Sequence, residues 1–120
     1  MKAQPGTWYT IGTNKGRKPV KIANIIMLKG DGASVTFYVL DELEKLGYYC
    51  ISVGKHLKCF EDAIHPDLVR INQKHIVNLN HVILLVKKTV QMRLPQNYRA
   101  DITDTYCKAV QAILGLSRAA

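Results

Sequence analysis

Three consecutive polar residues, Asn72, Gln73 and Lys74, are the side chains of this sequence best suited to binding chemistry. Two amides and an ammonium group offer several hydrogen-bond donors and acceptors and one positive charge. They follow a short apolar and basic run and precede a stretch in which polar and apolar residues nearly alternate, and no acidic residue occurs anywhere in residues 68–82. We therefore expect a strand, an exposed loop and a buried return strand, with the loop contacting nucleic acid.

The distribution of charge supports an anionic ligand. The chain has 17 Lys and Arg against 9 Asp and Glu, a net charge of +8. Residues 1–30 and residues 68–100 contain no acid at all, so the remaining residues carry every carboxylate side chain. A polyanion-binding face needs such segregation, because nearby carboxylates would oppose contacts with phosphates. A generally basic, soluble surface is the alternative that composition leaves open.

Enzymatic and metal-dependent functions find little support. The sequence contains no Gly-x-Ser-x-Gly elbow, no P-loop and no His-Glu-x-x-His motif, so we expect neither an enzyme nor a cofactor. His56, Cys59 and His65 could be ligands, but without a fourth they are better interpreted as a core thiol and two solvated imidazoles. The three cysteines, Cys50, Cys59 and Cys107, are widely spaced, and this spacing predicts reduced and mostly buried thiols.

The chain is expected to form one cytoplasmic domain, residues 8–114, with tails at 1–7 and 115–120. It has neither a signal-peptide core nor an apolar run that approaches the length of a membrane helix. Residues 41–46 are too few for an independent helix and could instead form the tip of a long hairpin. Residues 55–64 are predicted to form an amphipathic helix, whose first residues, Lys55 and Lys58, could hold a phosphate or simply be solvated. The predicted elements are strands at 8–11, 17–22, 25–28, 34–40, 48–53, 68–71, 82–86, 90–94 and 98–102, and helices at 55–64 and 103–114.

Residues 68–82 resemble the LytTR family of DNA-binding domains, the output modules of bacterial two-component response regulators. In that family a strand ending in arginine and a branched residue leads into a polar triplet, an aromatic residue, two aliphatic residues and an asparagine. Residues 69–78 of this chain, Val-Arg-Ile-Asn-Gln-Lys-His-Ile-Val-Asn, fill those places in order. The flanking segments 22–32, 55–67 and 91–106 are also similar to the family, so the resemblance covers residues 8–114.

This resemblance implies a mainly β, elongated antiparallel domain with two short helices, one of them C-terminal. Its function would be sequence-specific binding of double-stranded DNA by a bacterial transcriptional regulator, through loops 29–34, 72–74 and 99–105 in the major groove. Two copies would bind a direct repeat, and a receiver domain or sensor on another chain would supply the signal. The expected DNA contacts are Lys29, Asn72, Gln73, Lys74 and Arg99.

Individual roles follow from the chemistry of base edges. Gln73, or Asn72 in its place, can pair with adenine, while Lys74 can reach guanine or a phosphate. Asn78 lies between aliphatic residues and is expected to bond backbone rather than DNA. Two alternatives stay open: an RNA-binding or ribosome-associated domain that stacks bases on tyrosines, and a protein-interaction module that uses its sheet edges.

The chain also departs from the family pattern. The usual triplet is His-Arg-Ser, whereas Asn-Gln-Lys here moves the positive charge to Lys74, so the preferred bases should differ. Asp104 stands where many members have an arginine; we expect it in the first helical turn, where a negative charge is favourable. Residues 41–47 are longer than the usual hairpin, and the sequence indicates no function for them.

Overall fold

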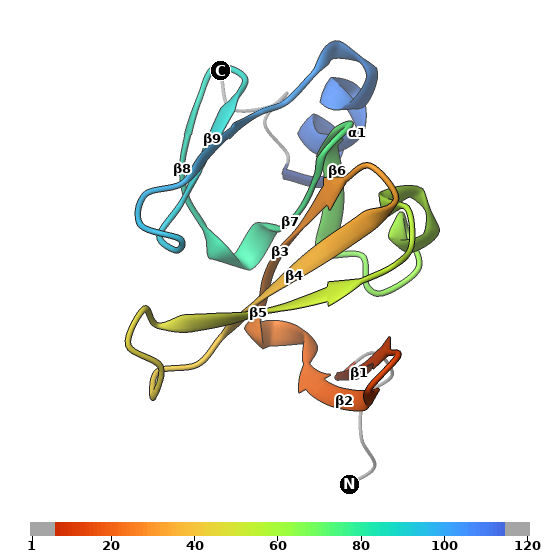
Figure 1. Cartoon of the computed structure of the whole chain (residues 1–120). Helices are drawn as coiled ribbons and strands as arrows, with labels where there is room; N and C mark the ends of the chain where they lie inside the picture. The colour runs from red at the N-terminus through yellow and green to blue at the C-terminus, as the bar shows by residue number, and fades with distance from the viewer. Residues whose placement is uncertain (1–6, 115–120) are drawn as a thin grey trace, which may run out of the picture.

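The computed structural model describes residues 7–114, with side chains as far as residue 112. About half of these residues belong to ten antiparallel strands, and the C-terminal part forms the α-helix α1 (Asp104–Leu114) (Figure 1). The strands are β1 (Trp8–Thr13), β2 (Gly16–Lys21), β3 (Ile25–Asp31), β4 (Ser34–Leu40), β5 (Tyr48–Val53), β6 (Leu68–Asn72), β7 (His75–Asn78), β8 (Val82–Val86), β9 (Thr89–Met92) and β10 (Arg99–Asp101). Three short 3-10 helices, η1 (Ile22–Asn24), η2 (Leu57–Phe60) and η3 (Leu79–His81), connect them.

The strands form three sheets. A five-stranded sheet has the order β5-β4-β3-β7-β6, a three-stranded sheet the order β10-β9-β8, and β1 and β2 form a separate hairpin. Figure 1 shows β8 and β9 across from the larger sheet, with α1 beside β6 and the β1–β2 hairpin at the opposite end. The molecule measures 46 × 40 × 29 Å along its principal axes. In residues 7–114 no helix has the length and apolar character needed to cross a membrane.

Two hydrophobic cores lie on opposite faces of the five-stranded sheet. Ile25 and Leu28 of β3 belong to the first core, which the β1–β2 hairpin and η2 cover. Ile26 and Met27 belong to the second core, between the two larger sheets and α1. A β-bulge between Ile25 and Met27 turns Ile26 and Met27, which are adjacent in sequence, toward the same face. The apolar run 25–28 is therefore a strand buried on both faces.

The predicted strands are confirmed, with ends that shift by one to three residues, as at 25–28 (Ile25–Asp31), 90–94 (Thr89–Met92) and 98–102 (Arg99–Asp101). Residues 41–46 form the tip of the β4–β5 hairpin and not a helix. The helix expected at 55–64 is wrong: only the four residues of η2 are helical, and the backbone is extended again at Glu61. Leu57 and Phe60 both reach the first core from one 3-10 turn, so the spacing that suggested an α-helix does not require one.

The prediction of mostly buried cysteines is also wrong. Cys50 and Cys59 are exposed and Cys107 is half-buried, and all three are free thiols. Cys50 occupies an outward position of the edge strand β5, and Cys59 faces solvent between Leu57 and Phe60 in η2. Apolar neighbours fill the inward positions there, which leaves Cys50 and Cys59 outside both cores, whereas Cys107 packs against the second core.

Candidate nucleic-acid interface

The three loops predicted to act together are joined in the structure. Residues 72–74 connect β6 to β7, with the loop 29–34 on one side and the segment 99–105 on the other. Backbone and side-chain hydrogen bonds link the three: Gly30 N donates to Lys74 O at 2.7 Å, Asn72 Nδ2 to Asp101 O at 2.7 Å, and Thr103 N to Ile71 O at 2.9 Å. Segments more than 25 residues apart in sequence thus form one connected surface.

Asn72 has an internal role in this surface. Its Oδ1 accepts hydrogen bonds from Lys74 N at 2.8 Å and from the His75 ring at 2.9 Å, while its Nδ2 donates to Asp101 O. All these partners belong to the protein, so the amide has little capacity left for a base edge. Among the expected contacts, Asn72 is better placed to position the loop than to read DNA.

Arg70 fixes the loop backbone, a role that the sequence did not reveal. Its Nε donates to Asn72 O at 3.1 Å and its Nη2 to Gln73 O at 2.9 Å, while Nη1 pairs with Glu61 Oε1 at 2.8 Å. The guanidinium carbon also lies 5.5 Å from the ring centroid of Tyr106 on α1. The planar fork of arginine suits this set of partners, because each nitrogen is directed at a different acceptor.

His75 is a neutral, buried member of the same network. Its Nδ1 faces Asn72 Oδ1, an acceptor, and therefore carries the proton; Nε2 then accepts from the Tyr98 hydroxyl at 2.7 Å. Burial, reinforced by the positive charges of Lys29 and Lys74, lowers the pKa of His75 from 6.5 to about 4. Protonation would turn Nε2 into a donor, so the Tyr98 hydroxyl would have to rotate and accept the hydrogen bond that it now donates.

This lowered pKa predicts a dependence of stability on pH. The unfolded chain, with an imidazole pKa near 6.5, binds a proton more readily than the folded chain, with its pKa of about 4. The contribution of neutral His75 to the free energy of unfolding should therefore be fully present above pH 6.5. It should decrease by about 2–3 kcal/mol as the pH falls toward 4. Urea denaturation followed by circular dichroism across this range measures the loss.

A His75→Phe variant is the control, because its carboxylates titrate as in the wild type while residue 75 does not. The wild type should lose more stability than the variant over the same pH range. Equal losses would contradict a neutral His75 in the folded protein.

Gln73 and Lys74 combine a fixed backbone with free side chains. Gln73 O accepts from Arg70, Lys74 N donates to Asn72, and Lys74 O accepts from Gly30. Both residues are exposed, and within residues 7–112 neither side chain has a hydrogen bond or an ion pair. These two side chains are therefore presented to solvent from a rigid support.

Two grooves flank this pair. The first, of about 370 Å³, runs toward the start of α1, and the second, of about 320 Å³, runs toward the β3–β4 turn and η2. The first is lined by Asn72, Gln73, Lys74, Thr103, Thr105 and Tyr106, and the second by Gly30, Gly32, His56, Leu57, Lys58, Arg70, Gln73 and Lys74. None of the residues lining either groove is acidic.

Lys58 and Lys29 add positive charge near the loop. Because η2 is a single 3-10 turn, no helix dipole adds to the positive charge of Lys58 for binding a phosphate. Lys58 nevertheless lines the second groove beside Gln73 and Lys74. A Cβ on Gly30 would be 3.2 Å from the Cβ of Leu57, so the close approach of η2 depends on this glycine. Lys29 is half-buried, with its Nζ 5.8 Å from the ring centroid of Tyr98.

Arg99 lies apart from these residues. It is exposed on β10 and lines another groove, on the outer face of the three-stranded sheet, together with Lys87 and Gln91. Asp104 is the first residue of α1, as expected, and it accepts a hydrogen bond from Lys88, which lowers the pKa of the Asp104 carboxyl. The structure thus groups Lys29, Asn72, Gln73 and Lys74 but separates Arg99 from them.

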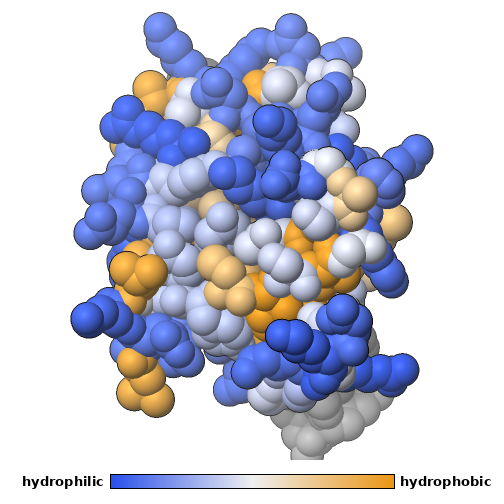
Figure 2. All heavy atoms as spheres, in the orientation of Figure 1, coloured by the Kyte–Doolittle hydropathy of each residue, from blue (hydrophilic) through white to orange (hydrophobic). Residues whose placement is uncertain are grey.

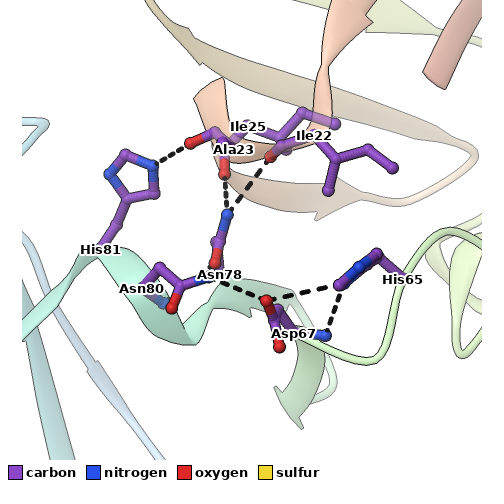
Figure 3. A network of polar contacts seen from close by, with 8 residues as sticks. All are labelled: Ile22, Ala23, Ile25, His65, Asp67, Asn78, Asn80 and His81. Carbon is purple, nitrogen blue, oxygen red and sulfur yellow. Dashed lines mark hydrogen bonds and ion pairs between the residues drawn. The ribbon is translucent and has the colours of Figure 1, made fainter. Parts of the chain in front are cut away.

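Asn78 supports the return strand from inside. Its side chain is 1% exposed, and its Nδ2 donates to Ile25 O at 2.9 Å and to Ile22 O at 3.3 Å, while Oδ1 accepts from Asn80 N at 2.9 Å (Figure 3). The expected structural role is confirmed. One amide thus joins the end of β7 to the η1 turn that precedes β3. The loop 72–74 leads into β7, and the loop 29–34 begins at the end of β3.

The fold has a counterpart among solved structures. It is similar to the LytTr DNA-binding domain of a Bacillus cereus protein described as a methyl-accepting/DNA response regulator, with a TM-score of 0.64 and 21% sequence identity. The similarity covers 91% of this chain and 97% of that chain. No protein-family model matches the sequence, and no curated protein matches it. The predicted fold is therefore confirmed: this chain has the antiparallel β fold of LytTR DNA-binding domains.

Proposed function

We propose that this protein is a transcriptional regulator that binds double-stranded DNA sequence-specifically, with the loops 29–34, 72–74 and 99–105 at the major groove. The observation that carries the proposal is the contrast at Gln73 and Lys74, where the backbone is held by Arg70, Asn72 and Gly30 while both side chains are free. Reading a base edge requires a donor or acceptor at a defined position, and such a support supplies it. The fold it shares with a LytTr DNA-binding domain is consistent with this function.

The side chains have distinct roles in this proposal. The Gln73 amide is suited to a paired hydrogen bond with adenine, and Lys74 to guanine or a phosphate. Lys29 and Lys58 would add phosphate contacts from the neighbouring segments. Asn72 positions the loop, and Arg99 lines a different groove and is not needed for base reading. Two copies would occupy a direct repeat, and a receiver domain or sensor on another chain would control them.

RNA binding by stacking on tyrosines has less support. Tyr9 and Tyr49 pack against the first core, and Tyr38, Tyr48 and Tyr98 pack against the second. Each of the five is only partly accessible. An RNA reader of the sheet-borne type needs aromatic faces open to the bases.

The proposal predicts that duplex DNA binding is specific and strongly dependent on salt. Selection from random duplex DNA should enrich a direct repeat, and the affinity for the selected site should fall by orders of magnitude, about 10³-fold, between 50 and 200 mM salt if six phosphates are contacted. Sequencing of the selected duplexes identifies the repeat, and fluorescence anisotropy measures the affinity at each salt concentration. Equal or tighter binding to single-stranded RNA would contradict the proposal.

Single substitutions in the loop then separate reading from charge. Gln73→Ala should weaken discrimination at one base by about 1–3 kcal/mol, whereas Lys74→Ala should weaken all sequences alike and reduce the salt slope by about one. Lys15→Ala is the matched control, since it removes the same charge at the exposed β1–β2 turn. If neither loop variant differs from the control, residues 72–74 are not the reading surface.

A further inference from the structure

The tip of the β4–β5 hairpin, residues 41–47, is an ordered loop that presents leucines to solvent. Asp41 N donates to Gly47 O at 2.9 Å, and Gly47 N donates to Glu44 O at 2.9 Å. Leu43 N also donates to Asp41 Oδ1 at 3.0 Å. Leu43 is nevertheless 96% exposed and Leu46 is 67% exposed. The leucines are thus held outward by a fixed backbone, and Figure 2 shows apolar side chains projecting where Figure 1 places this tip.

The base of the tip is equally well defined. Gly47 has a φ of 85°, which favours glycine, and a Cβ at this position would be 3.2 Å from Leu94 Cδ1. The loop therefore rests against the segment between β9 and β10. Its length and its leucines are not needed for either core, because both leucines point away from the protein.

The tip is also acidic, in contrast to the chain as a whole. Asp41, Glu42 and Glu44 outnumber Lys45 within five residues, whereas the complete chain has a net charge of +8. A surface that complements the tip should therefore be apolar and basic. DNA does not meet this description.

The outer face of the three-stranded sheet meets it. A groove of about 380 Å³ is lined there by Leu84, Val86, Lys87, Thr89, Gln91 and Arg99. Leu84 is 50% exposed and Val86 is 54% exposed, on the edge strand β8. Within the described residues, Lys87 and Arg99 have no ion pair, whereas the neighbouring Lys88 is paired with Asp104 and Asp101 accepts from Thr89. The groove is apolar, with two unpaired cations.

We propose that the tip of one copy of this protein docks into the outer-face groove of a second copy. Leu43 and Leu46 would cover Leu84 and Val86, and the acids of the tip would face Lys87 and Arg99. The contact joins two different patches, so it can form once, head to tail, or twice, with each tip in the groove of the other copy about a two-fold axis. A two-fold contact between tips would bring acid against acid, and one between grooves would bring cation against cation.

The proposal goes beyond DNA binding and is tested without DNA. Sedimentation velocity at low salt should show that the weight-average sedimentation coefficient of the wild type rises with protein concentration. Association should be detectable by about 1 mM protein. Added salt should weaken the association, because charged groups contribute to it. Leu43→Ser, Glu42→Lys and Lys87→Glu should each remove it without loss of folded structure, since all three residues are exposed.

Mixing two of these variants tests the pairing of the tip with the groove directly. Glu42→Lys retains an intact groove and Lys87→Glu retains an intact tip, so the mixture should form dimers although neither variant associates alone. Lys15→Glu, which makes the same charge change outside both patches, should associate like the wild type. Absence of association in the wild type at about 1 mM, association that survives Leu43→Ser, or a mixture that stays monomeric would each overturn the proposal.

Discussion

Replacing Asn78 with alanine should reduce the free energy of unfolding by about 2–4 kcal/mol and lower the melting temperature by about 10–20 °C. The amide donates to Ile25 O at 2.9 Å and to Ile22 O at 3.3 Å from a position that is 1% exposed. Alanine leaves both carbonyls without this donor and opens a cavity the size of an amide group. A small domain has a total stability of only about 5–15 kcal/mol, so the loss is a large part of it.

Asn80→Ala is the matched control for this substitution. It removes the same amide two residues away, where the side chain is exposed and donates only to Asp67 Oδ2 at 2.8 Å. Its cost should stay below about 1 kcal/mol. Urea denaturation followed by circular dichroism compares the two variants, and equal losses would show that the buried bonds of Asn78 are not a main support of β7.

Local patterns in the sequence predicted most of this fold. The four apolar residues 25–28 predicted a buried strand, and the alternation in 34–40 a half-buried one; both are observed. The helix expected at 55–64 failed because Leu57 and Phe60 fit one 3-10 turn as well as an α-helix. Spacing at i and i+3 does not distinguish the two when the segment is short.

The candidate site was predictable in place but not in its internal roles. A motif match located residues 72–74, yet the sequence could not show that the Asn72 amide bonds Asp101 O, 29 residues away. Nor could it show that β10 turns Arg99 onto the outer face, away from Gln73. Both facts depend on how the second sheet packs against the first, which no local pattern specifies.

The second large effect is expected at Arg70, which under the proposed function would act on DNA only through the loop that it holds. Arg70→Lys keeps the positive charge but cannot direct three nitrogens at Asn72 O, Gln73 O and Glu61. The loop should become mobile, and affinity for the selected DNA site should fall about tenfold or more, equivalent to at least about 1.4 kcal/mol. Binding to unrelated duplex DNA and the salt slope should be nearly unchanged, because the net charge is the same.

Glu61→Gln provides the comparison that assigns the effect to the loop. It weakens one partner of Arg70 but leaves the hydrogen bonds to Asn72 O and Gln73 O in place, so specific affinity should stay close to that of the wild type. Comparable losses of specific and non-specific binding in Arg70→Lys would instead identify a direct phosphate contact. Unchanged specific affinity would mean that the Arg70 guanidinium is not what holds Gln73 and Lys74 in position for sequence reading.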